Sequence, residues 1–188
     1  MIKKAVIDID NTLWQFCDVL YEGLREVNSA LPSPDSWINW DFWMHFCSED
    51  EFMSVIHRIQ MTQDNDSHLP YKEAENFLKT LKDHNFHIVI ASHRTPESLV
   101  QTKRWLLKHN LIFDELHLSS DKTVLFNETC HVVVDDSPFV LDNAAEKGIF
   151  ATGLKFPWNM NHGNNGYKLF NNLDSVLKHI LETIKTPH

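Results

Sequence analysis

The feature that most constrains the fold is an apolar run near the N-terminus, Ala5-Val6-Ile7, which leads directly into the segment Asp8-Ile9-Asp10-Asn11-Thr12. Consecutive apolar residues predict a strand buried on both faces, as in a parallel sheet that is covered by helices. Asp8 and Asp10 are two positions apart at the end of this strand, so their carboxylates project to the same side. Asn11 and Thr12 then suit a sharp turn out of the sheet.

The pair Asp8 and Asp10 predicts a metal site. Two carboxylates held so close repel each other, and a bound divalent cation allows both to stay ionised. A carboxylate beside such a cation can attack phosphorus, because the metal neutralises the negative charge of the phosphate. We therefore expect a metal-assisted phosphoryl-transfer site at the end of the first strand.

The overall composition narrows the classes of partner. The chain has 188 residues and a formal net charge of −9, which fits one domain with a small insertion. This charge argues against a nucleic-acid polymer or an anionic membrane as the main partner, and no apolar run approaches a membrane span. Cys17, Cys47 and Cys130 form no CxxC pair, which predicts reduced thiols in a cytoplasmic protein rather than a zinc site or disulfides.

Strand-like apolar runs alternate with helical patterns along the chain. This alternation predicts an α/β fold with a mostly parallel five-stranded sheet flanked by helices. The expected strands are Ala5–Ile9, His87–Ala91, Glu115–Leu118, His131–Val134 and Ile149–Leu154. The expected helices between and after them are Tyr71–His84, Pro96–His109, Pro138–Lys147 and Leu173–Ile184.

A long segment separates the first expected strand from the second, far longer than an ordinary crossover requires. Within it, Phe16–Ala30 and Glu49–Gln60 have helical patterns, and Ser48 and Glu51 are spaced as a capping box before the second helix. We interpret residues 16–69 as a small helical cap over the sheet, and residues 1–15 and 70–188 as the α/β core.

Three further polar clusters follow expected strands. They are Ser92-His93-Arg94-Thr95, Ser119-Ser120-Asp121-Lys122-Thr123 and Asp135-Asp136-Ser137-Pro138. In parallel α/β sheets, ligands bind outside the carboxyl ends of the strands, so these clusters should converge with Asp8 and Asp10 on one crevice.

This set of motifs resembles the haloacid-dehalogenase (HAD) superfamily of phosphotransferases. Within it, the sequence is most similar to the 5′(3′)-deoxyribonucleotidase family and its bacterial and phage relatives. The similarity rests on Asp8-Ile9-Asp10 followed by Phe16, on Lys103-Arg104-Trp105 ahead of Asp121-Lys122-Thr123, and on Val134-Asp135-Asp136. The resemblance implies a Rossmann-like core with a small cap inserted after the first strand.

The resemblance also implies catalytic and metal-binding roles. Asp8 would be the nucleophile that forms an aspartyl-phosphate, and Asp10 would be the general acid and then the general base. Asp8, the backbone carbonyl of Asp10 and Asp135 would hold Mg²⁺. Asp136 would orient these ligands or bind a metal-bound water.

Substrate contacts are implied for Ser92, which would hydrogen-bond the phosphoryl oxygens, and for Lys122, which would neutralise their charge. His93 and Arg94 could add positive charge near the phosphate. The aromatic residues between the two expected cap helices are mostly core, but a base needs flat apolar surfaces on which to stack. The aromatic residues expected to face the substrate are Phe16, at the start of the first cap helix, and Trp40 and Trp43.

The function that this resemblance implies is hydrolysis of a phosphomonoester, a nucleoside or deoxynucleoside monophosphate, with Mg²⁺ as cofactor. Asp10 favours ester hydrolysis, because dehalogenases and phosphonatases of the superfamily generally lack it. One alternative is a phosphatase for a sugar phosphate or a phosphotyrosine-like ester, since Asp10–Trp14 also resembles the magnesium-dependent phosphatase-1 family, which lacks the long insertion. Another is a nucleotide- or protein-binding module without turnover. An exposed face of the aromatic cap could support a homodimer.

Overall fold

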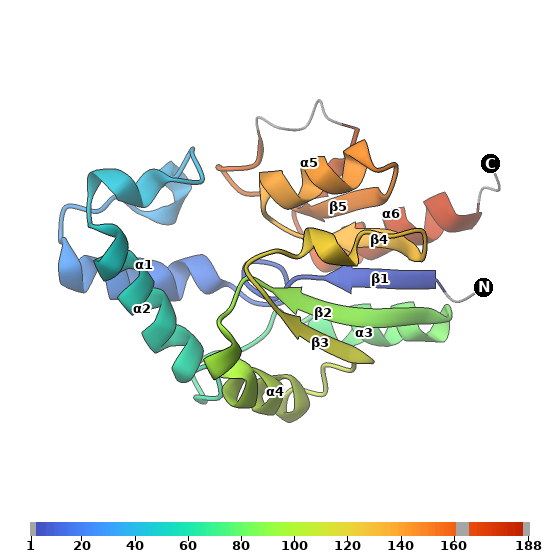
Figure 1. Cartoon of the computed structure of the whole chain (residues 1–188), viewed down its shortest axis with the longest axis horizontal. Coiled ribbons are helices and arrows are strands. Elements are labelled where there is room, and N and C mark those ends of the chain that lie inside the picture. Colours follow the sequence, from blue (N-terminus) through green and yellow to red (C-terminus); the bar gives the residue numbers. More distant parts are fainter. Residues whose placement is uncertain (1–2, 161–165, 186–188) are drawn as a thin grey trace.

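A parallel sheet forms the centre of the molecule in the computed structural model, which describes residues 3–160 and 166–185. The six strands lie in the order β3-β2-β1-β4-β5-β6, and every neighbouring pair is parallel (Figure 1). Their bounds are β1 Lys3–Ile7, β2 Phe86–Ser92, β3 Glu115–Leu118, β4 Cys130–Val134, β5 Phe150–Leu154 and β6 Lys168–Phe170. The parallel α/β fold is thus confirmed.

The expected number of strands was wrong, because the sheet has six strands and not five. The additional strand β6 is only three residues long and lies at the edge of the sheet, where it pairs with β5. A run so short has no periodicity that separates it from a loop. The first strand also ends at Ile7 and not at Ile9, so Asp8 directly follows it.

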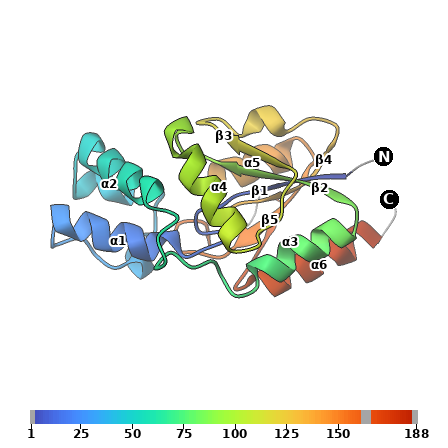
Figure 2. The ribbon, with the colours of Figure 1, turned by 90° about the horizontal axis from the view of Figure 1, so that it is seen from below.

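Helices cover both faces of the sheet. Their bounds are α1 Phe16–Val27, α2 Glu49–Met61, α3 Ala74–Asp83, α4 Leu99–Lys108, α5 Pro138–Glu146 and α6 Leu173–Lys185. α3 and α6 lie side by side on one face (Figure 2), and α5 packs on the other. Among the residues that the structure describes, no helix has the length and apolarity needed to cross a membrane.

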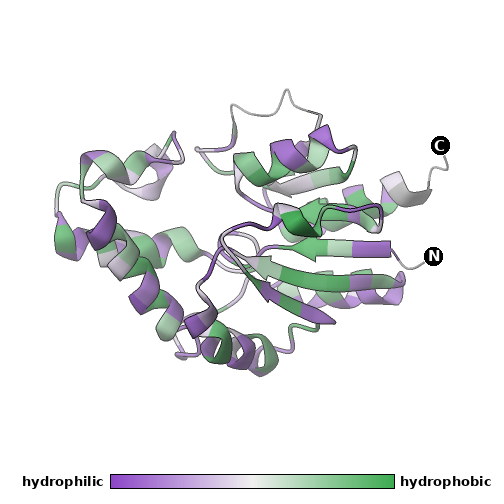
Figure 3. Cartoon of the chain, viewed as in Figure 1, coloured by the Kyte–Doolittle hydropathy of each residue, from purple (hydrophilic) through white to green (hydrophobic). Residues whose placement is uncertain are grey.

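The alternation of buried side chains along β1 places one hydrophobic core on each face. Ala5 and Ile7 belong to the core that contains the buried residues of α3 and α6, whereas Val6 belongs to the core under α5. All three side chains are at most 1% exposed, and the strands are predominantly hydrophobic in Figure 3. Burial on both faces explains why the sequence here is a continuous apolar run.

The helices α1 and α2 pack against each other and project beyond the carboxyl ends of the strands (Figure 1). Gly23 makes this packing possible, because a Cβ atom there would lie 2.6 Å from Cγ1 of Val55 on α2.

The predicted capping box at the start of α2 is confirmed, since Ser48 N donates to Glu51 Oε2 at 2.8 Å and Glu51 N donates to Ser48 Oγ at 3.3 Å. We call residues 16–61 the α1–α2 segment.

The two connections between the α1–α2 segment and the sheet run side by side. Tyr71 N donates to the carbonyl oxygen of Leu13 at 2.8 Å, and Trp14 and Pro70 form an isolated antiparallel bridge. Two short 3₁₀ helices, Pro34–Ser36 and Phe42–His45, join α1 to α2. The segment therefore leaves and re-enters the core at one place, next to Trp14, whose Nε1 donates to Asp10 Oδ1 at 2.9 Å.

Candidate active site

A cavity of about 630 Å³ lies between the carboxyl ends of the strands and the α1–α2 segment. All of the residues predicted to act in catalysis or to hold the metal line it, namely Asp8, Asp10, Ser92, Lys122, Asp135 and Asp136. They come from the ends of β1, β2 and β4 and from the turn after β3. The predicted convergence of the four motifs is confirmed.

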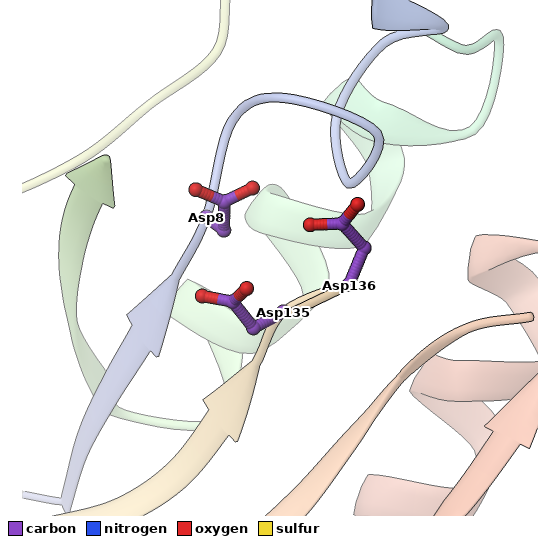
Figure 4. A group of neighbouring side chains, drawn as sticks. All are labelled: Asp8, Asp135 and Asp136. Atoms are coloured by element: carbon purple, nitrogen blue, oxygen red, sulfur yellow. The ribbon is translucent and has the colours of Figure 1, made fainter. Parts of the chain in front are cut away.

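Three of these carboxylates form a buried cluster. One oxygen from each of Asp8, Asp135 and Asp136 lies within 4.8 Å of the others, and Figure 4 shows the three side chains gathered after β1 and β4. Burial, partly offset by Lys122, raises the pKa of Asp8 to about 7, and Asp135 and Asp10 add to the rise. Burial also raises the pKa of Asp136 well above its usual range, helped by the charges of Asp8 and Asp135.

Lys122 supplies the positive charge at this cluster. Its Nζ atom lies 2.6 Å from Asp8 Oδ1 and 2.8 Å from Asp135 Oδ2, and the side chain is almost fully buried. Burial lowers the pKa of Lys122, but Asp135 and Asp8 outweigh that effect and hold the pKa above its ordinary value. One ammonium cannot neutralise three carboxylates, so a divalent oxygen-seeking cation such as Mg²⁺ fits the donor set of Asp8, Asp135 and Asp136. The side chain of Asp10 lies outside this cluster. Binding of the metal by the backbone carbonyl of Asp10 remains a prediction.

Mg²⁺ is expected to raise the melting temperature more at about pH 8 than at about pH 5.5. The raised pKa values of Asp8 and Asp136 mean that the metal-free fold loses stability as the pH rises from the usual carboxyl range towards 7. A bound cation removes that loss at high pH, whereas at low pH it must first displace protons. Thermal unfolding with and without Mg²⁺, at matched ionic strength, measures the difference. An equal or larger shift at the lower pH would contradict this metal site.

The carboxylate of Asp10 is held by Arg94, and this placement corrects the expectation that Arg94 lies near the phosphate. Arg94 Nε donates to Asp10 Oδ2 at 2.9 Å and Arg94 Nη2 donates to Asp10 Oδ1 at 2.5 Å. The Arg94 side chain is fully buried and does not line the cavity. Burial raises the pKa of Asp10, but the charge and hydrogen bonds of Arg94, with a hydrogen bond from Trp14, lower it below its usual value.

The other predicted substrate contacts lie around the cavity. Ser92 ends β2 and is 1% exposed, whereas His93 is exposed at the rim. Phe16 is buried at the start of α1, and Trp40 and Trp43 also line the cavity. Their contacts with a substrate remain predictions.

The wall that belongs to the α1–α2 segment is aromatic. Trp37 stacks on Phe42 with ring centroids 3.7 Å apart, and Trp43 stacks on Phe52 at 4.4 Å. Trp158, from the loop after β5, lies 6.4 Å from Trp37 and carries this wall across to the core. Among the described residues that line the cavity, Lys122 and His93 are the only basic ones, and neither comes from the α1–α2 segment.

Three residues that position Asp135 and Asp136 had not been predicted. Asn11, with a φ of 58°, donates through Nδ2 to Asp136 Oδ2 at 3.1 Å. Asn159 donates through Nδ2 to the carbonyl oxygen of Asp136 at 3.0 Å. A Cβ atom at Gly153 would lie 1.9 Å from the carbonyl oxygen of Asp135, so only glycine fits there. The Asn-Thr turn was a usable signal for Asn11, but the sequence offers none for Gly153.

Solved structures with the same fold include proteins described as phosphatases and as HAD hydrolases. The structure resembles a predicted phosphatase from Clostridium acetobutylicum, with 17% identity, a TM-score of 0.64 and coverage of 97% of this chain and 99% of that one. A HAD hydrolase of family IA from Entamoeba histolytica has 15% identity and a TM-score of 0.66, and the similarity covers 98% of this chain and 100% of that one. A Bacillus subtilis protein described as a HAD-hydrolase bound to magnesium has 16% identity and a TM-score of 0.62, and the similarity covers 96% of this chain and 99% of that one.

No protein-family model matches this chain, and no curated protein matches it. At such low identities the likeness to solved structures establishes the fold. The chain has a Rossmann-like α/β core of the kind found in these structures, with a helical segment inserted after the first strand.

Proposed function

We propose that this protein is a Mg²⁺-dependent phosphomonoester hydrolase that dephosphorylates nucleoside monophosphates through an aspartyl-phosphate. The observation that carries the proposal is the two-sided cavity. One end holds a carboxylate cluster with a buried lysine, and the other end is an aromatic wall without cations among the lining residues that the structure describes. The fold shared with phosphatases and hydrolases of the HAD group supports the reaction class.

The proposal gives each of these residues a role that its place in the cavity supports. Asp8 attacks phosphorus through a carboxylate oxygen, and the bond from phosphorus to the ester oxygen breaks. Asp10 takes a proton from the bound phosphate monoanion, gives it to that leaving oxygen and afterwards accepts one from the water that hydrolyses the aspartyl-phosphate. Ser92 and Lys122 bind the phosphoryl oxygens. Bound Mg²⁺ would be held by Asp8, Asp135 and Asp136 and would neutralise negative charge on the phosphate.

The leaving group is inferred from the chemistry of the wall. The stacked pairs Trp37–Phe42 and Trp43–Phe52 provide flat apolar surface, which suits a nucleobase. A substrate with a second phosphate or a carboxylate would bring another negative charge into a cavity whose only described basic residues are Lys122 and His93. Burying such an unpaired charge is unfavourable.

A panel of phosphomonoesters tests this proposal with Mg²⁺ present. We expect kcat/KM for thymidine and uridine monophosphates to exceed that for glucose 6-phosphate and phosphoglycolate by about 10²-fold. Glucose 6-phosphate lacks a base that could contact the aromatic wall, and phosphoglycolate also brings a carboxylate that would have no positive partner there. Nucleoside diphosphates should be poor substrates for the same reason of charge.

Two results would contradict the proposal in different ways. A kcat/KM for sugar phosphates equal to that for nucleotides would overturn the substrate class and leave the reaction class standing. A lack of Mg²⁺-dependent phosphate release from every ester in the panel would overturn the reaction class and favour a binding module.

A further inference from the structure

The buried guanidinium of Arg94 joins Asp10 to two elements outside the cavity. Besides its two bonds to Asp10, Arg94 donates through Nη1 to Thr102 Oγ1 on α4 at 3.1 Å. Through Nη2 it donates to Gln63 Oε1, just beyond the end of α2, also at 3.1 Å. Thr102, Gln63 and the Arg94 side chain are all fully buried, so this network is shielded from water.

The network distinguishes the two oxygens of Asp10. Oδ1 accepts from Arg94 Nη2 and from Trp14 Nε1, which lies 2.9 Å away. Oδ2 accepts from Arg94 Nε and from Ser92 Oγ, which lies 3.3 Å away. Since Ser92 lines the cavity, Oδ2 is the oxygen on the side of the phosphate site, and Oδ1 is held by its two nitrogen donors.

We propose that Arg94 is a positioning residue that fixes the Asp10 carboxylate with Oδ2 presented to the leaving oxygen. This inference rests on the proposed hydrolase function. When the phosphate takes the hydrogen bond of Ser92, Oδ2 loses one partner and faces the substrate. The Asp10 carboxylate accepts four hydrogen bonds and is ionised before the substrate binds, so Oδ2 first takes the proton of the bound phosphate monoanion. The bond from Asp8 to phosphorus then forms, the bond to the ester oxygen breaks with its electron pair on oxygen, and the proton passes from Oδ2 to that oxygen.

Arg94 in turn is held in place by Thr102 and Gln63. A planar guanidinium forms two parallel bonds to a carboxylate, a geometry that the single ammonium of lysine does not reproduce. Because Gln63 follows α2 directly, Arg94 also connects the orientation of Asp10 to the end of the α1–α2 segment. Misplacing a catalytic group by about 1 Å can lower a rate by about 10²-fold.

The test is the variant Arg94→Lys, assayed with 4-nitrophenyl phosphate and benzyl phosphate. The nitrophenolate leaves without a proton, whereas the benzyl alkoxide requires one. The parameter kcat/KM reports the first chemical step and so isolates the proton donation by Asp10. We expect kcat/KM for benzyl phosphate to fall about 10²-fold and kcat/KM for 4-nitrophenyl phosphate to fall less than about 3-fold.

Arg104→Lys is the matched control, because Arg104 is on the same helix as Thr102 and its side chain is 68% exposed. It should change neither value. Thr102→Val removes one acceptor from Arg94 and keeps the shape of the side chain. It should give a smaller loss, about 3-fold, with benzyl phosphate alone, and it decides the question if Arg94→Lys does not fold.

Equal losses with both esters, in Arg94→Lys or in Thr102→Val, would overturn the positioning role. Failure of the proposed function is seen separately, because the wild-type protein would then release no phosphate from either ester in the presence of Mg²⁺.

Discussion

Replacing Asp8 with asparagine is expected to lower kcat for phosphomonoester hydrolysis by about 10⁴-fold or more, as removal of a catalytic nucleophile does. The amide cannot form the aspartyl-phosphate, and it also removes one of the three carboxylates of the predicted metal site. Phosphate release with thymidine monophosphate, measured at saturating Mg²⁺, gives the comparison. Asp83→Asn on the exposed end of α3 is the matched control and should retain full activity.

The same variant should fold and melt at least as high as the wild type without metal at about pH 8. Burial raises the pKa of Asp8 to about 7, so its ionised form destabilises the metal-free fold above that pH. Asparagine removes that charge and can still accept a hydrogen bond from Lys122. Activity near the wild-type level in Asp8→Asn would exclude Asp8 as the nucleophile.

Replacing Lys122 with methionine should give the second-largest effect. The ammonium is the buried partner of both Asp8 and Asp135, at 2.6 and 2.8 Å. Its loss leaves these charges uncompensated, so the free energy of unfolding without Mg²⁺ should fall by about 3–5 kcal/mol. The rate of hydrolysis should fall by about 10²–10³-fold, because a cation that stabilises the phosphoryl oxygens is missing.

Chemical denaturation with and without Mg²⁺ measures this effect, and Mg²⁺ should restore part of the lost stability by supplying positive charge. Lys178→Met is the control, since Lys178 pairs with Glu182 on the exposed surface of α6 with 76% of its side chain exposed. That change should alter stability by less than about 1 kcal/mol. Wild-type stability in Lys122→Met would show that Lys122 is not the counter-charge of the cluster.

The core of the fold could be predicted because strands buried on both faces leave continuous apolar runs. Val132–Val134 and Ala5–Ile7 are such runs, and each ends directly before the aspartates that it positions. The turn at Asn11 was also recognisable, because asparagine tolerates the positive φ that it adopts. Local sequence therefore contained both strands, although the predicted end of the first one, Ile9, was two residues too late.

Long-range pairing could not be predicted from the same information. Arg94 follows Ser92 in a polar cluster, which suggested contact with phosphate, but its guanidinium turns inward to Asp10, Thr102 and Gln63. Those partners lie on separate elements, and only the folded chain brings them together. Likewise, the helical spacing of the aromatic residues does not reveal that the ring of Trp37 lies 6.4 Å from the ring of Trp158, which comes from the loop after β5.

The most direct test of phosphoryl transfer to Asp8 is mass spectrometry of the protein quenched in acid during turnover of 4-nitrophenyl phosphate with Mg²⁺. We predict that the peptide containing Asp8 carries the mass of one phosphoryl group, and that Asp8→Asn shows no such adduct. An adduct on another residue, or turnover without any adduct in the wild type under conditions that preserve acyl phosphates, would contradict the account.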